Sequence, residues 1–194
     1  MITTDDIKTL RDLTGVSVMQ CKKALEEAGG DKEKALIILR KKSGALAAKK
    51  GDRALAAGAI QAYVHNTRTV ASLVLLACET DFVAKNEEFV KLAYDIAMQV
   101  AAANPEYLSR AEVDATAMGK AKEVFASEVA GRPEDLQTKI LAGKLDAYFK
   151  DKILLEQAFV KDPGRSIRDL VDGAIQKFGE RIEIAKFVRF DVRG

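Results

Sequence analysis

The chain has 194 residues, of which 48% are hydrophobic and 31% are charged. Its 31 basic and 29 acidic residues leave a net charge of +2, which argues against a protein built mainly to hold nucleic acid. The longest apolar run is far shorter than the ~20 residues that a membrane span requires. The polar and acidic start resembles neither a secretory signal nor a transit peptide. These features together predict a cytoplasmic protein with a sizeable core.

The first 44 residues predict three short helices that pack as a small bundle. Their apolar residues recur at helical spacing, and three helices in about 45 residues lie near the lower limit for independent stability. Polar caps and glycine stops delimit them: Thr3 and Gly15 for the first, Ser17, Gln20 and Gly29–Gly30 for the second, Asp31 and Gly44 for the third.

Residues 45–58 form the predicted linker between two domains. Basic residues from 41 onward stand among alanines and glycines: Lys41, Lys42, Lys49, Lys50 and Arg53. Alanine favours helix, so we expect a helical linker. The basic side chains fit either a solvated face or a contact with an acidic protein surface or RNA.

Residues 59–194 predict an α+β core domain. Alternating apolar residues at 59–65 indicate a half-buried strand, and the apolar run 70–78 indicates a buried one. The turn-forming residues 66–69 join the two as a hairpin. The alternating segment 181–192 predicts a third antiparallel strand, which gives a three-stranded sheet packed with helices.

Helices fill the rest of this domain. One begins after Asn86 and ends at Asn104–Pro105, and one runs from about Glu112 to Ala130, with Gly131 as its stop. Two more follow, with these predicted markers: Pro133 as a first helical position, Asp162–Gly164 as a turn after an irregular stretch, and Ser166, Asp169 and Gly179 around the last helix.

Residues with catalytic or ligand-binding chemistry are few. The single histidine, His65, stands at a predicted strand end without a nucleophile motif beside it. Cys21 and Cys78 fall inside apolar patterns 57 positions apart and predict reduced core residues. The sequence has no CxxC pair, no GxxxxGK[ST] and no GxGxxG. We therefore expect a binding protein, with no metal, no cofactor and no bound nucleotide of its own.

The most informative stretch is 80–86, Thr-Asp-Phe-Val-Ala-Lys-Asn. It connects the buried strand to the helix after Asn86, and polar residues usually occupy such a connection. Phe82 and Val83 stand there instead. An apolar side chain on an exposed connection is typical of a partner contact. The alternative is that Phe82 packs back onto its own sheet and stabilises it.

Two motifs resemble the signatures of the elongation factor Ts family. Residues 14–25, Thr-Gly-Val-Ser-Val-Met-Gln-Cys-Lys-Lys-Ala-Leu, are similar to its N-terminal signature, and 80–86 is similar to its second. The segments 132–140, 154–162 and 187–192 also resemble family sequence. The likeness covers essentially the whole chain, and two long motifs in the expected order are specific.

The resemblance implies a non-enzymatic guanine-nucleotide exchange factor that binds elongation factor Tu in its GDP state and speeds GDP loss. It implies a ubiquitin-associated-type N-terminal bundle. Asp81 and Phe82 correspond to a pair that enters the GTPase, where the phenylalanine wedges between two helices and displaces the magnesium ion. Thr80 and Val83 flank the wedge. The matching partner contacts of the first signature are Val18, Met19 and Lys22.

The chain also departs from the family pattern. Family members often carry small residues and paired methionines where this chain has Val16, Ser17, Val18 and Met19, and it lacks a contacting histidine that some members have. Longer members add a second core half and a helical hairpin, and this chain is too short for both. Short members tend to pair as homodimers, so the resemblance implies a dimerisation role for residues 59–194.

Two other functions remain open on the sequence. The lysines of the linker and the small helical domain fit a non-catalytic RNA- or ribosome-associated module, although exposed aromatics arranged for base stacking are lacking. The bundle taken alone also fits an adaptor that binds a ubiquitin-like protein.

Overall fold

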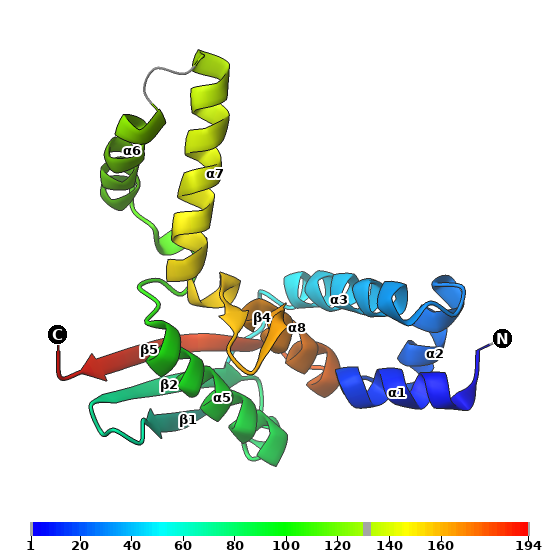
Figure 1. Cartoon of the computed structure of the whole chain (residues 1–194). Coiled ribbons are helices and arrows are strands. Elements are labelled where there is room, and N and C mark those ends of the chain that lie inside the picture. The colour runs from blue at the N-terminus through cyan, green and yellow to red at the C-terminus, as the bar shows by residue number, and fades with distance from the viewer. Residues whose placement is uncertain (1, 130–132, 194) are drawn as a thin grey trace.

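A computed structural model describes residues 2–129 and 133–193 of the chain. Three parts meet around one central helix: an N-terminal bundle, a sheet covered by helices, and a hairpin of two helices that projects away from the sheet (Figure 1). The fold is α+β, as predicted, and the predicted three-stranded antiparallel sheet and helical N-terminus are confirmed.

The bundle consists of α1 (Thr4–Thr14), α2 (Val18–Glu27) and α3 (Lys32–Lys49). All three predicted caps form: the side chains of Thr3, Ser17 and Asp31 accept backbone N–H groups of the first turns. Gly15 ends α1 in a left-handed conformation, with φ of 70°. The bundle has its own small core, made of Leu10, Val16, Cys21, Ala24, Leu25, Ala35 and Leu39.

The predicted helix end at Gly44 is wrong, because α3 continues to Lys49. One glycine costs a helix only about 1 kcal/mol, and the run Ala45-Leu46-Ala47-Ala48 has high helix propensity. This last part of α3 packs along α8 (Ile167–Phe178), where Leu46 and Ala47 contact the core of the sheet region. Residues 45–49 of the predicted linker are therefore helical, and this part of α3 packs against α8.

The sheet has three antiparallel strands in the order β1 (Ala57–Val64), β2 (Val70–Cys78) and β5 (Ile182–Asp191). The pairing shifts between Leu75 and Leu76, which face Lys186 and Ile184, so Ala185 is the extra residue of a bulge in β5. Three helices pack on one face: α4 (Asp81–Ala84), α5 (Glu87–Ala103) and α8. Asn86 caps α5 and Asn104 ends it, as predicted.

The projecting hairpin consists of α6 (Ala115–Val129) and α7 (Glu134–Lys152), preceded by the short helix η1 (Arg110–Glu112). Longer family members add a second core half and a helical hairpin, and this chain is predicted to be too short for both. The structure nevertheless contains a helical hairpin, formed by α6 and α7. The start predicted at Glu112 is corrected to Ala115, since Asp114 accepts the N–H of Ala117 at 2.6 Å.

The start of α7 differs from the prediction by one residue. Pro133, predicted at the first helical position, occupies the position just before the helix. The predicted end of α6 at Ala130 and its stop at Gly131 lie outside the described residues. Four residues form the buried centre of the hairpin's own small core: Ala121, Leu145, Phe149 and Ile153.

A short ribbon links the hairpin to α8. It follows η2 (Leu154–Glu156) and pairs β3 (Ala158–Phe159) with β4 (Asp162–Ser166). The turn predicted at 162–164 is therefore the start of a strand. Helix α8 begins after Ser166 and ends at Gly179, as predicted. Ser166 and Asp169 form a capping box, and Gly179 has a left-handed conformation.

The remaining sequence markers fall at ordinary structural positions. Cys21 and Cys78 are buried free thiols, which confirms their predicted place in the core. His65 directly follows β1 and hydrogen-bonds to Thr67 in the hairpin turn. Within the described residues, no helix is both long and apolar enough to cross a membrane.

Candidate functional site

The stretch after β2 forms one turn of helix rather than an irregular connection. Thr80 caps α4, and its Oγ1 accepts the N–H of Val83 at 3.4 Å. Val83 is only 3% exposed and belongs to the main core, whereas Phe82 is 81% exposed. The alternative in which Phe82 packs onto its own sheet is therefore wrong for this structure. The ring stands in water on a turn that Val83 anchors.

A single carboxylate fixes the start of this turn. Oε2 of Glu180 accepts the backbone N–H groups of Glu79, at 3.1 Å, and Thr80, at 3.0 Å. Oε1 of Glu180 accepts the hydroxyl of Thr80 at 2.6 Å. Glu180 lies between α8 and β5, so the contact joins residues about a hundred positions apart in sequence.

Glu79 adds a second set of contacts beside it. Its carboxylate accepts the backbone N–H of Arg181 at 2.5 Å and lies 3.2 Å from the guanidinium of Arg53. The Arg181 N–H, together with the charge of Arg53, lowers the pKa of Glu79. Lys50 donates to the carbonyl of Gly179 at 2.5 Å. Two residues of the linker, Lys50 and Arg53, are thus bonded beside the same turn, at Gly179 and Glu79.

Asp81 lies on the exposed side of α4. The ammonium of Lys85 donates to Asp81 Oδ2 at 2.7 Å and lowers the pKa of that carboxyl. Both side chains are 77% exposed, and ion pairs of this kind contribute little to stability. Asp81 therefore places a negative charge beside Phe82. It can exchange Lys85 for a group on another protein at a low cost in free energy.

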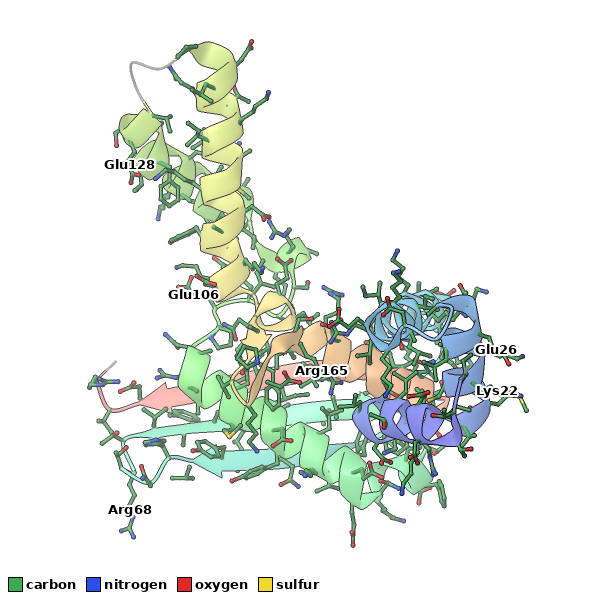
Figure 2. The ribbon with its side chains drawn as sticks, turned by 45° about the vertical axis from the view of Figure 1, so that its right-hand side comes forward. Lys22, Glu26, Arg68, Glu106, Glu128 and Arg165 are labelled. Atoms are coloured by element: carbon green, nitrogen blue, oxygen red, sulfur yellow. The ribbon has the colours of Figure 1, made fainter. Side chains whose placement is uncertain are left out.

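The predicted residues of the first signature lie in the first half of α2. Val18 is 52% exposed and Met19 68% exposed. Lys22 is also exposed, with its ammonium 3.8 Å from Glu26 (Figure 2). Two neighbouring apolar side chains in water, followed by a cation, suit a contact with another protein.

Lys177, near the end of α8, connects the two signatures. Its ammonium pairs with Glu88 in the first turn of α5, just after the second signature. Its aliphatic chain passes Gly15 in the first signature, where an added Cβ would lie 3.4 Å from Lys177 Cδ. Segments about 65 residues apart in sequence therefore approach the same end of α8.

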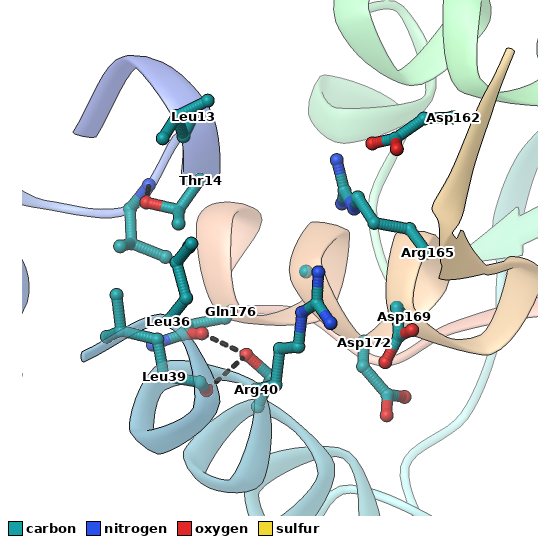
Figure 3. Close-up of a pocket in the computed structure, with 13 residues that line it drawn as sticks. Leu13, Thr14, Leu36, Leu39, Arg40, Asp162, Arg165, Asp169, Asp172 and Gln176 are labelled. Carbon is teal, nitrogen blue, oxygen red and sulfur yellow. Dashed lines mark hydrogen bonds between the residues drawn. The ribbon is translucent and has the colours of Figure 1, made fainter. Parts of the chain in front are cut away.

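A cavity of about 200 Å³ lies at the junction of the bundle with α8 and β4 (Figure 3). Arg40 and Leu39 line it from α3, and Arg165 and Asp172 line it from the other side. Burial raises the pKa of Asp172. All seven predicted site residues are described, and none of them lines this cavity. The cavity lies between the bundle, α8 and β4, outside the predicted site.

The sequence did not indicate several residues that organise the site. Glu180, Arg181 and Lys177 follow or end a helix in an ordinary pattern, and nothing local distinguishes them. The helical turn α4 had a local signal, because threonine at position 80 suits an N-cap.

Comparison with known proteins gives one consistent result. The family model described as Elongation factor TS matches residues 45–194. The Elongation factor Ts of Moorella thermoacetica is 44% identical over 99% of this chain and 96% of its own length. Those of Thermotoga petrophila and Thermodesulfovibrio yellowstonii are 45% and 46% identical, each over 98% of this chain and 96% of their own length. The chain therefore belongs to the elongation factor Ts family, whose members are translation elongation factors.

Proposed function

We propose that the chain is a guanine-nucleotide exchange factor that binds elongation factor Tu in its GDP state and promotes GDP release. The observation that carries this proposal is the 81% exposure of Phe82 on a turn held by Thr80, Val83 and Glu180. Moving a phenylalanine side chain from water into a partner contributes about 1.5–3 kcal/mol. Because the turn is already ordered, little of this is spent on ordering it.

In the proposed mechanism the ring of Phe82 enters the nucleotide domain of the GTPase and separates two of its helices near the magnesium ion. Asp81 enters with it and brings a negative charge close to the phosphates. Displacing the ion removes the main counter-charge of the phosphates, so GDP dissociates faster. The chain acts by binding alone and holds no nucleotide itself.

One ring is too little for strong exchange. Each tenfold change in GDP affinity requires about 1.4 kcal/mol, so Phe82 supplies one to two decades at most. We propose that residues 1–44 grip the same GTPase through Val18, Met19 and Lys22, while the domain at 59–194 carries the wedge. Both signature segments lie close to Lys177, which supports the proposal that they contact the GTPase at the same time. By linkage, GDP must weaken binding of this chain by the factor by which the chain weakens GDP.

Stopped-flow release of fluorescent GDP from elongation factor Tu tests the proposal. Adding the chain should raise the release rate with a saturating dependence on its concentration. Excess GDP should in turn dissociate the complex between the chain and the GTPase. A release rate that stays at its spontaneous value at every concentration would contradict the proposal.

The RNA-binding alternative receives less support from the linker region. Two basic side chains of the linker already have partners within the chain, Lys50 with the Gly179 carbonyl and Arg53 with Glu79. Just before the linker, Lys42 pairs with Glu27 at 2.5 Å. A salt titration separates the two functions. Strongly salt-dependent RNA binding without an effect on GDP release would favour the alternative.

We further propose that the chain acts as a homodimer that pairs through the open face of its sheet. On the face opposite the main core, all three strands expose large apolar side chains: Ile60, Val64, Leu73, Val188 and Phe190. A contiguous apolar face of this kind is typical of an interface. Two copies packed sheet against sheet would bury both faces.

A further inference from the structure

We propose that Glu180 is the positioning residue of this exchange factor, holding the turn at Thr80 so that Phe82 projects into the partner. This inference rests on the proposed function. Three hydrogen bonds run from residues 79 and 80 to the one carboxylate, and two of them come from backbone N–H groups. Hydrogen bonds to a charged acceptor are among the strongest in proteins.

The carboxylate is itself well supported. The preceding Phe178 ring packs edge-on against Phe89, which is fully buried, with centroids 6.1 Å apart. On one side of Glu180, the Gly179 carbonyl accepts from Lys50. On the other side, the Arg181 N–H donates to Glu79. Glu180 therefore stands between two fixed backbone positions and connects them to the turn at Thr80.

The path from Glu180 to the ring is short. Glu180 fixes Thr80, and the Thr80 side chain caps α4, which begins at the next residue. The turn has only four residues, so it has little helical stability of its own and depends on its cap and on Val83. Without Glu180, two backbone donors lose their acceptor, and the direction of Phe82 depends only on the Thr80 cap and on the burial of Val83. Glu180 does not touch the partner in this account.

The closing experiment compares three variants. Glu180→Ala removes all three contacts. Glu180→Gln keeps them, because its amide oxygen accepts both N–H groups and its NH₂ donates to Thr80 Oγ1. Glu112→Ala is the matched control, since this carboxylate accepts the N–H of Leu108 at 2.7 Å at the base of the hairpin.

Amide hydrogen exchange of the free chain measures directly how well the turn is held. The amides of Glu79 and Thr80 should exchange faster in Glu180→Ala and at nearly the parental rate in Glu180→Gln and Glu112→Ala. Unchanged protection in Glu180→Ala would overturn the inference whatever the exchange activity. If Glu180→Ala does not fold, loss of protection at these two amides in Glu180→Gln without loss of GDP release would overturn it as well.

The rate of GDP release then measures how the position of Phe82 affects exchange. The maximal release rate at saturating factor should fall about tenfold in Glu180→Ala, while the half-saturating concentration stays within about twofold because the N-terminal grip is intact. Glu180→Gln should restore the rate. In a Phe82→Ala background, Glu180→Ala should cause no further loss, because both changes remove the same contact.

The outcomes separate the two proposals. If Phe82→Ala is slow and Glu180→Ala is as fast as the parent, the positioning role is wrong and the proposed function stands. The positioning role is also wrong if Glu180→Ala slows GDP release by the same factor in a Phe82→Ala background as it does in the parent. If Phe82→Ala releases GDP at the parental rate, the proposed function fails, and the exchange of the two amides still decides whether Glu180 holds the turn.

Discussion

At the residue scale, Phe82 and Val83 are neighbours with opposite roles. Consecutive side chains on a helix point about 100° apart, so one turn can bury Val83 and expose Phe82. The sequence predicted an apolar pair in an unusual place. It could not predict which member faces the core, because that depends on how α4 meets β1 and β2, and these contacts are tertiary.

Glu79 gives a prediction on acid stability. The Arg181 N–H and Arg53 lower its folded-state pKa below the ordinary 4.5, so its stabilisation is present above about pH 4.5 and is lost as the pH falls through the lower value. Glu79→Gln removes this dependence. Urea unfolding at pH 7 and pH 3.5 should therefore show a smaller loss of unfolding free energy in Glu79→Gln than in the parent. Parallel losses in the two proteins would contradict the assignment.

At the element scale, caps were predictable and helix lengths were not. Thr3, Ser17, Asp31, Asn86 and Ser166 act as expected, because a cap is a local hydrogen bond. The predicted helix end at Gly44 is wrong because the packing of α3 against α8 keeps Gly44 helical, and this contact is not visible in the local sequence. The ribbon of β3 and β4 could not be predicted for a different reason: its strands are too short to carry an alternating pattern.

Gly44 also gives a prediction on stability. Its φ is not positive, and a Cβ there would meet Asp172 Oδ2 at an ordinary 3.5 Å. Gly44→Ala should therefore raise the free energy of unfolding by about 0.5–1 kcal/mol. Gly58→Ala is the contrasting control, because its Cβ would lie 2.5 Å from the Leu76 carbonyl oxygen and should destabilise the sheet. Urea denaturation checks both, and a loss of stability in Gly44→Ala would contradict the account.

At the scale of the whole molecule, long-range contacts determine the site. The sequence indicated the three strands and the two signature segments, and both signatures are where a partner can reach them. It gave no sign that Glu180 and Lys177, from one end of α8, hold the second signature and approach the first. Such pairings are set by topology and leave no periodic pattern in the chain.

The open sheet face gives a prediction on assembly. Sedimentation velocity should find the parent at twice the 21.1 kDa mass of one chain. Phe190→Lys places a charge on this face, where the side chain is 61% exposed, and should shift the protein to the single-chain mass. Val124→Lys, at a residue equally exposed on the hairpin, should leave the mass unchanged. A parent that sediments as one chain would contradict the proposed pairing.

The central claim concerns Phe82, and stopped-flow GDP release from elongation factor Tu with Phe82→Ala tests it most directly. Val124→Ala is the control for losing an exposed apolar side chain. Phe82→Ala should keep the parental melting temperature, since its ring has few contacts in the free chain, and should slow GDP release about ten- to a hundredfold at equal concentration. Val124→Ala should match the parent in both. GDP release at the parental rate from Phe82→Ala, or a melting temperature that falls sharply, would contradict the account.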